Sequence, residues 1–202
     1  MTRGPSFTFH AQIKLNMKRT LDLSLAVALI TLLLPLLIMV ATAVRLTSKG
    51  LVLYWSDRIG RGNKVFKMPK FRSMQLGTPV KATHLLGNPQ EYLTPIGSFL
   101  RRTSLDELPQ LWSILIGDMS LVGPRPALFN QQDLIQLRTK YGVHLLLSGL
   151  TGWAQVNGRD ELSIEDKVAL DVYYLENQSF WLDIKILWMT FIKVIRREGV
   201  SH

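Results

Sequence analysis

A long apolar segment dominates the hydrophobic pattern of this chain. From Leu23 to Val44 it reads LSLAVALITLLLPLLIMVATAV, with no charged residue over 22 positions. A helix of this length reaches across the hydrocarbon core of a bilayer, about 30 Å. The stretch is long for the apolar region of a signal peptide, and no small-residue cleavage site is followed by a domain with the look of a translocated one. The pattern therefore predicts a membrane helix.

Pro35 lies in the middle of this segment. Proline removes one helical hydrogen bond and crowds the preceding turn, so the helix should bend there. Basic residues flank the segment at both ends: Arg3, Lys14, Lys18 and Arg19 before it, and Arg45, Lys49, Arg58 and Arg61 after it. Because Lys and Arg mark the cytoplasmic side of a membrane, both ends are expected on that side.

These observations favour a re-entrant membrane helix over residues 18–48, broken at Pro35, that enters and leaves by the same face. An ordinary membrane-spanning anchor is the alternative. A polar tail of residues 1–17 would precede the helix, and a cytoplasmic catalytic domain of residues 49–202 would follow it.

The rest of the pattern predicts an α-rich α+β domain with a small β element. Residues 51–75 are rich in aromatic and β-branched residues around the turn GRGN, which indicates strands. Gly and Pro indicate a loop over 76–98. Apolar spacing predicts helices over 105–116, from about 126 to 140, over 163–178 and over 179–199, and residues 148–163 are expected to form a loop. Ser104 and Glu107 have the spacing of a capping box.

The last predicted helix carries an apolar stripe and a basic end. The stripe consists of Trp181, Ile184, Trp188, Phe191, Ile192 and Ile195, and the basic residues are Lys193, Arg196 and Arg197. The basic end is consistent with compensation of the helix dipole. It is equally consistent with an amphipathic helix at a membrane surface, with its cations at the headgroups. The sequence leaves both interpretations open.

The charge balance favours an anionic partner. There are 24 Lys and Arg against 15 Asp and Glu, a net charge of +9. Nucleic acid, acidic lipid and phosphorylated small molecules all fit this excess, and the apolar segment favours lipid. The absence of cysteine excludes disulfides, thiol nucleophiles and Cys-ligated zinc. The four histidines are scattered and none forms HExxH, so a zinc enzyme is not expected.

Cations and acids recur among Gly, Pro and Ser in four short stretches, where a packed core has little use for them. Arg125 is the sharpest case, because the prolines on both sides fix its backbone and leave its guanidinium pre-oriented to bind a phosphate. The stretches are KFRSM with Lys70 and Arg72, FLRRTSLDELPQL with Arg101, Asp106 and Glu107, GDMSLVGPRP with Arg125, and GWAQVNGRD with Arg159.

Asp106 and Glu107 are adjacent carboxylates that repel each other, so their neighbours or a cation must offset that cost. Asp can act as a covalent nucleophile towards phosphorus, a divalent metal can screen its approach, and a neighbouring Glu can bind that metal or move a proton. The alternative is two acids in a first helical turn, stabilised by the dipole. No P-loop, no Asp-x-Asp and no GxSxG occurs in the chain.

Four stretches together resemble the bacterial sugar transferase family: KRTLDLSLAVALITLLLPLL, KMPKFRSM, GSFLRRTSLDELPQLWSILIGDMSLVGPRP and GLTGWAQVNGR. The resemblance runs from about Lys18 to Arg196. It is closest to the small monotopic phosphoglycosyl transferases that begin lipid-linked glycan assembly. It implies transfer of sugar-1-phosphate from a UDP-sugar to polyprenyl phosphate, with release of UMP, in a ping-pong reaction at the bacterial inner membrane.

The resemblance also implies roles for particular residues. Asp106 would attack the β-phosphorus, and Glu107 would assist beside Mg²⁺, which Asp106 would also contact. Lys70, Arg72, Arg101 and Arg125 would hold phosphates or the nucleotide, and Arg159 matches the family less closely. The membrane helix would break at Pro35, with Lys18 and Arg19 at the cytoplasmic headgroups.

Two positions depart from the family pattern. Leu34 stands where serine often precedes the helix-breaking proline, and Ser148 stands where proline is common. Neither change affects the expected nucleophile.

Two rival functions remain at this point. A membrane glycosyltransferase would release UDP, although the missing Asp-x-Asp argues against it. A non-enzymatic basic membrane adaptor should carry its cations as one run, whereas here they are spread among turns. Nucleic-acid binding is not expected, because it gives the apolar segment no use. The family suggests an N-acetylhexosamine donor, and the oligomeric state stays open, a homo-oligomer included.

Overall fold

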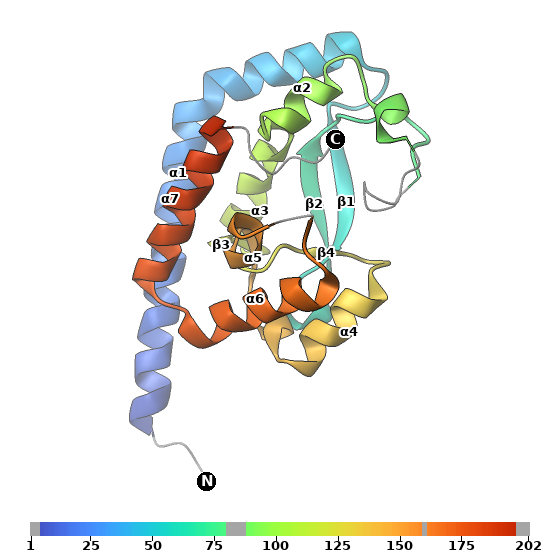
Figure 1. Ribbon diagram of the computed structural model, residues 1–202. Helices are drawn as coiled ribbons and strands as arrows, with labels where there is room; N and C mark the ends of the chain where they lie inside the picture. The colour runs from blue at the N-terminus through green and yellow to red at the C-terminus, as the bar shows by residue number, and fades with distance from the viewer. Residues whose placement is uncertain (1–4, 80–87, 159–160, 197–202) are drawn as a thin grey trace.

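A computed structural model of the protein describes residues 5–79, 88–158 and 161–196, with the side chains of α1 described from Met17 onward. The fold is a helix-rich α+β arrangement around two small sheets (Figure 1). The α-helices are α1 (Pro5–Thr47), α2 (Gly97–Arg102), α3 (Leu111–Ile116), α4 (Gln132–Lys140), α5 (Trp153–Val156), α6 (Ile164–Asn177) and α7 (Phe180–Arg196). The predicted α+β class is confirmed.

Helix α1 contains the apolar segment expected from the sequence. Within the described residues it is the one helix long and apolar enough to cross a membrane, over Met17–Thr47, with a mean hydropathy of 2.8. Only 11% of its most apolar stretch is buried in the protein, so most of this surface needs another apolar environment. This is consistent with membrane association.

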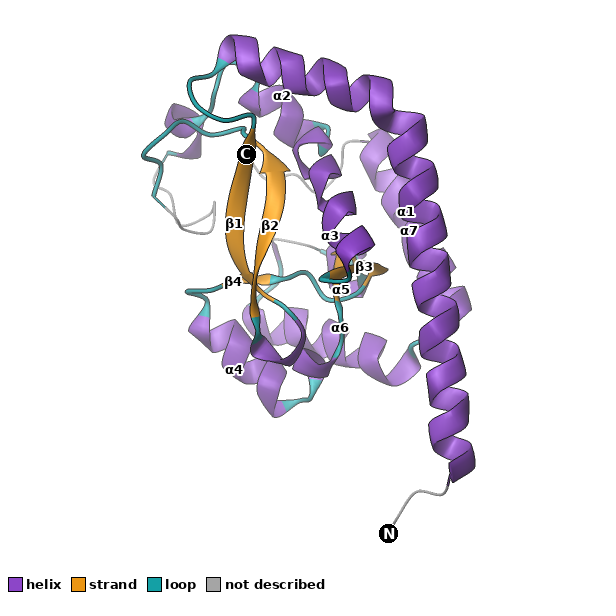
Figure 2. Ribbon diagram, turned by 180° about the vertical axis from the view of Figure 1, so that it is seen from behind, coloured by secondary structure: helices purple, strands orange, loops and turns teal. Residues whose placement is uncertain are grey.

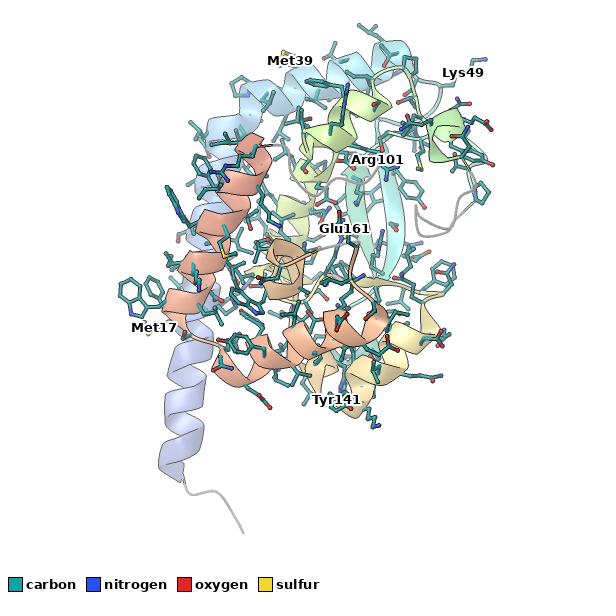
Figure 3. All side chains as sticks on the ribbon, viewed as in Figure 1. Met17, Met39, Lys49, Arg101, Tyr141 and Glu161 are labelled. Carbon is teal, nitrogen blue, oxygen red and sulfur yellow. The ribbon has the colours of Figure 1, made fainter. Side chains whose placement is uncertain are left out.

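The helix does not run straight (Figure 1). Met17 lies on its lower part and Met39 beyond a change of direction at the top (Figure 3). Pro35 falls between these two residues, although the helix continues through it without interruption. Residues 5–17, expected to be a polar tail, begin this same helix.

The strands form two separate sheets. Strands β1 (Leu53–Ile59) and β2 (Val65–Phe71) make the expected antiparallel hairpin, in which Tyr54 lies opposite Lys70, and β4 (Ala127–Leu128) pairs with the other edge of β1. Figure 2 shows this hairpin from behind. Strands β3 (Met119–Val122) and β5 (Ser148–Thr151) form a parallel pair. The pairings of β4 with β1 and of β5 with β3 bring together segments that are distant in the chain.

Two predicted boundaries are wrong. Residues 148–163 are not a loop throughout, because they contain β5 and α5, and the helix expected from about Pro126 begins only at Gln132. In both places a short pairing with a distant strand determines the structure, which local turn residues do not reveal. The helices expected over 105–116, 163–178 and 179–199 are present, the first as a 3₁₀ segment, η4 (Leu105–Gln110), followed by α3.

The core joins α1 to the rest of the chain. Ala26 of α1 is buried with Met119, Tyr174 and Ile186 in one apolar cluster, and Val40 and Val44 are buried with Phe71 and Leu100 in a second. Helix α7 buries Ile186, whereas its predicted apolar stripe faces outward, with Trp181 77% and Ile195 64% exposed. The stripe named from the sequence is therefore not the core-facing side.

Candidate functional site

Glu107 is the centre of a buried charge cluster. The Lys70 Nζ donates to Glu107 Oε1 at 2.9 Å, and both guanidinium ends of Arg125 donate to the same carboxylate, Nη1 to Oε2 at 3.3 Å. The exposed fraction is 15% for the Lys70 side chain and 12% for that of Glu107. Removing one member would leave its partners buried without full compensation.

The neighbouring Asp106 is 7% exposed and lies on η4. Burial raises the pKa of its carboxyl, Lys70 opposes this rise, and the charge of Glu107 adds to it. Burial likewise lowers the pKa of Lys70, against the attraction of Glu107. A carboxyl whose pKa is raised by burial is a stronger nucleophile once it is ionised, and this suits Asp106 to attack at phosphorus.

Ser104 places these two carboxylates in an unexpected way. It is one of two non-glycine residues with positive φ in the described chain, at 56°, and its side chain makes no capping hydrogen bond. Its carbonyl accepts from Glu107 N at 3.1 Å. The predicted capping box is therefore wrong, because left-handed backbone at Ser104 directs its hydroxyl elsewhere. A left-handed serine stores strain, which often marks a functional turn.

The segment Pro124–Arg125–Pro126 holds Arg125 rigidly. Its two prolines lack N–H groups, yet all three of its carbonyls accept hydrogen bonds from other elements: Gly149 N to Pro124 at 2.9 Å, Arg138 Nη1 to Arg125 at 2.7 Å and Arg58 Nη1 to Pro126 at 3.3 Å. Arg138 is itself paired with Asp171, through Nη2 to Oδ2 at 2.6 Å and Nε to Oδ2 at 2.9 Å. The position of the Arg125 guanidinium thus depends on β5, α4 and β1.

The backbone just before the Pro124–Arg125–Pro126 segment lies very close to the backbone of β5. A side-chain carbon at Gly149 would lie 2.1 Å from Gly123 N, and one at Gly152 would lie 2.1 Å from Gly123 O. Only glycine tolerates such contacts. The GLTG stretch, predicted to be part of a loop, is therefore the strand edge against which the Pro-Arg-Pro segment is fixed.

Arg58 is a site residue that the sequence did not single out. It lies on β1, its Nε donates to Ser56 Oγ at 3.0 Å, and burial and then the charge of Arg125 lower its pKa to about 10. Its signal was the hairpin register: with Tyr54 opposite Lys70 and Arg58 opposite Phe66, period-2 alternation puts Arg58 and Lys70 on one face. As one of the basic residues that flank the apolar segment, Arg58 gives no other sign of a place in the site.

The other predicted binding residues are placed differently. Arg101 lies on α2 (Figure 3), and its charge acts on Asp106. Arg72 follows β2, and its Nε donates to the Leu51 carbonyl at 2.7 Å, at the end of the sheet rather than on Glu107. Arg159 lies outside the described residues.

Lys18 and Arg19, expected at lipid headgroups, have protein partners. Lys18 Nζ lies 2.6 Å from Asp183 Oδ2 on α7, and Arg19 Nη1 donates to the Ile114 carbonyl at 2.6 Å at the end of α3. Nearby, Asp22 Oδ1 accepts from Leu121 N at 3.1 Å. These contacts fix the start of the apolar stretch against the domain, and any lipid contact of the two cations stays a prediction.

A cavity of about 350 Å³ adjoins the charge cluster. Leu29, Leu33 and Leu36 of α1 and Leu187 and Val194 of α7 form apolar walls. Glu107 and Arg125 line it together with Arg102, Thr151, Thr190, Gln155 and Lys193. The cavity therefore connects the membrane-length helix α1 with the charge cluster.

The fit of a metal ion depends on the two adjacent acids. Across the described part of the chain, no three His, Asp or Glu residues gather as a ready-made metal site. Mg²⁺ needs only one or two carboxylates when substrate phosphates and waters complete its shell, so Asp106 and Glu107 fit such an ion.

Comparison with known proteins gives one consistent answer. A family model described as bacterial sugar transferase matches residues 13–197. An undecaprenyl-phosphate glucose phosphotransferase of Komagataeibacter xylinus is 42% identical over 196 residues, covering 92% of this chain and 36% of that protein. The UDP-glucose:undecaprenyl-phosphate glucose-1-phosphate transferase of Escherichia coli (strain K12) is 41% identical over 184 residues, covering 88% and 40%.

A shorter relative matches along most of its own length. The uncharacterized sugar transferase EpsL of Bacillus subtilis (strain 168) is 41% identical over 189 residues, covering 92% of this chain and 91% of that protein. The chain spans less than half the length of the two longer relatives. With a family model over nearly its whole length, the chain belongs to the bacterial sugar transferase family.

Proposed function

We propose that the protein is a phosphoglycosyl transferase that moves sugar-1-phosphate from a UDP-sugar to polyprenyl phosphate, with undecaprenyl phosphate as the acceptor, and releases UMP. The observation that carries the proposal is the Asp106–Glu107 pair, which is packed among Lys70 and Arg125 at the end of a cavity walled by the apolar helix α1. A site for a soluble acceptor would have no use for such a wall. The similarity to undecaprenyl-phosphate sugar transferases supports the same reaction.

The reaction would proceed in two displacement steps. In the first, an oxygen of the Asp106 carboxylate attacks the β-phosphorus of the donor, the bond from that phosphorus to the bridging oxygen breaks, and UMP leaves with the electron pair. In the second, a phosphate oxygen of the polyprenyl phosphate attacks the same phosphorus. The bond to Asp106 breaks, and its carboxylate is restored as polyprenyl diphosphate-sugar leaves.

The surrounding cations suit this chemistry. Lys70 and Arg125 hold Glu107 and would offset the negative charge that a diphosphate brings. Arg101 is close enough to act on Asp106 electrostatically. Arg72 and Arg159 stay predictions as nucleotide ligands, because the described structure does not place them at Glu107.

Mg²⁺ is part of this proposal. Asp106 and Glu107 would hold it together with the donor phosphates, and when bound it would screen the approach of one anion to another. Lys70 and Arg125 occupy the Glu107 carboxylate here, so these cations would share Glu107 with the ion or shift toward the phosphates.

The membrane arrangement is also proposed. Helix α1 would be re-entrant, bent at Pro35, with both ends on the cytoplasmic face of the bacterial inner membrane. The change of direction between Met17 and Met39 and the basic residues on both flanks support this arrangement. The exposed tryptophans of α7 would lie at the lipid surface.

The natural absence of cysteine allows a direct test of this topology. Single cysteines introduced at Thr2 and Lys49 should both react with a thiol reagent only from the cytoplasmic side. Labelling of position 2 from the outer face would instead mean a spanning helix.

The donor sugar stays open between hexoses and N-acetylhexosamines. The resemblance pointed to a UDP-N-acetylhexosamine derivative, whereas the names of relatives include glucose, galactose and N-acetylgalactosamine. A panel of these UDP-sugars, assayed in nanodiscs with Mg²⁺ and undecaprenyl phosphate, should give UMP with at least one donor. Release of UDP would mean direct glycosyl transfer and would overturn the proposed role of Asp106.

A further inference from the structure

We propose that the cavity between α1 and α7 is the binding site of the acceptor, and that Lys193 binds the phosphate of that lipid. This inference rests on the proposed function and adds to it a location and a residue. Lys193 belongs to the basic end of α7, which the sequence explained equally well by dipole compensation or by contact with headgroups. The structure places its side chain on the cavity wall instead.

The apolar walls fit an isoprenoid chain. Leu29, Leu33 and Leu36 recur every three or four residues, so they present one face of α1 to the cavity. The adjacent Leu32 is 75% exposed on another face, where the proposed membrane would lie. A lipid could therefore pass from the bilayer into the cavity along the same helix without exposing its chain to water.

The polar lining fits a phosphate monoester. Arg102, Arg125 and Lys193 bring three cationic side chains to the cavity, and the Thr151 and Thr190 hydroxyls lie 2.7 Å apart on the same wall. A monoester carries more negative charge than the diester of an ordinary phospholipid, so three cations favour it.

The cavity also meets the chemistry of the second step. Glu107 and Arg125 line it and at the same time belong to the cluster beside Asp106. A phosphate bound between Arg125 and Lys193 would therefore lie next to the phosphosugar carried by Asp106. The donor nucleotide has no need of leucine walls, so it is expected on the side of Lys70 and the β1–β2 hairpin.

Lys193→Gln tests this assignment, with Lys185→Gln as its matched control. Lys185 lies on the same helix but stacks over the Trp153 ring, 5.3 Å from its centroid, and does not line the cavity. Loss of a charged hydrogen bond should raise the KM for polyprenyl phosphate about 10-fold or more in the first variant. The KM of Lys193→Gln for the UDP-sugar should equal that of Lys185→Gln. A rise in the donor KM alone would overturn the proposal.

Leu33→Trp and Leu32→Trp form a second matched pair. Leu33 lines the cavity, whereas Leu32 points to the outer surface. Filling the cavity should weaken acceptor binding by about 10-fold or more, whereas a tryptophan on the lipid-facing side should leave it unchanged. Equal effects of the two changes would overturn the proposal.

A binding measurement without donor separates this inference from the proposed reaction. Native mass spectrometry of the protein with undecaprenyl phosphate should show binding that Leu33→Trp and Lys193→Gln weaken, whichever nucleotide the enzyme releases. Phosphatidic acid and phosphatidylglycerol serve as competing lipids. Equal retention of phosphatidylglycerol would assign the cavity to ordinary anionic phospholipid, and equal binding by all four variants would place the acceptor elsewhere.

Discussion

The ion pair of Arg138 and Asp171 should control activity through Arg125, although neither residue belongs to the charge cluster. Arg138 donates to the Arg125 carbonyl at 2.7 Å while Asp171 holds its other end. Both residues are buried, at 8% and 2% exposure. Asp171→Ala would leave a buried guanidinium unpaired, which costs about 3–5 kcal/mol. For a chain of this size that corresponds to a Tm lower by about 6–20 °C.

The informative variant is the double change Arg138→Met with Asp171→Leu. Replacing a buried ion pair by apolar residues of similar volume is often neutral or stabilising, so the Tm should stay near that of the natural protein. The donor to the Arg125 carbonyl is nevertheless lost, and a small displacement of Arg125 should lower nucleotide release by about 10- to 100-fold. Val168→Ala serves as control, because it disturbs the apolar cluster of Ala127, Leu134 and Val168 on β4, α4 and α6 and removes no side-chain hydrogen bond.

A double-mutant cycle with Arg125→Ala decides whether the pair acts through that residue. If it does, removing the pair costs little further activity once the Arg125 side chain is gone. Fully multiplicative losses would refute the reasoning and leave the pair a purely structural role. Hydrogen exchange of residues 123–129 gives an independent readout, and it should quicken in the double variant but not in Val168→Ala.

Asp106→Asn should reduce turnover by about 10⁴-fold or more, as loss of a nucleophile does. In thermal unfolding its Tm should be as high as before or higher, because burial raises the pKa of this carboxyl and Asn removes a disfavoured charge. The ionised Asp106 is the reactive form, so activity should fall as pH falls through its raised pKa. In a pH–rate profile, Lys70→Gln should move the fall in activity at low pH to higher pH, because Lys70 lowers the pKa of Asp106. Glu107→Gln should move it to lower pH, because the charge of Glu107 raises that pKa. Opposite movements would contradict the electrostatic assignment. Ser104→Gly should relieve the strain of a positive φ and raise the Tm slightly, whereas Ser104→Val should cost about 1–3 kcal/mol; equal effects in a thermal shift assay would speak against the strained turn.

Local signals in the sequence identified the parts of the site that lie close together in the chain. Proline on both sides of Arg125 predicted a fixed guanidinium, and in the structure this guanidinium donates hydrogen bonds to the Glu107 carboxylate. The unbalanced pair of carboxylates required cations, and Lys70 and Arg125 supply them. The turn GRGN predicted the hairpin that carries Lys70 to the site. In each case one short stretch contained enough constraint to define the geometry.

The missed parts depend on contacts between distant segments. The Gly-rich, polar composition of residues 148–163 predicts a loop, whereas in the structure Gly149 and Gly152 allow two backbone segments to approach closely. The capping box failed for a similar reason, since tertiary packing holds Ser104 in a left-handed conformation that its spacing to Glu107 does not reveal. Arg138 has no local signal in the sequence, because its partner Asp171 lies 33 positions later in the chain.

The cations near the apolar segment show why a position in the chain assigns partners poorly. Lys18 and Arg19 were expected to contact headgroups, yet they bind Asp183 and the end of α3, while Lys193 from the far end of the chain lines the cavity that α1 walls. A cation near a membrane helix can compensate a protein acid, cap a helix or bind a lipid phosphate, and its position in the chain does not separate these roles. The arrangement of α1 and α7 separates them, because it decides which cations contact protein atoms, as Lys18 does, and which line the cavity, as Lys193 does. The proposed acceptor site is therefore formed by two helices that lie more than 130 residues apart in the chain. Variants on either helix should weaken the binding of the same lipid.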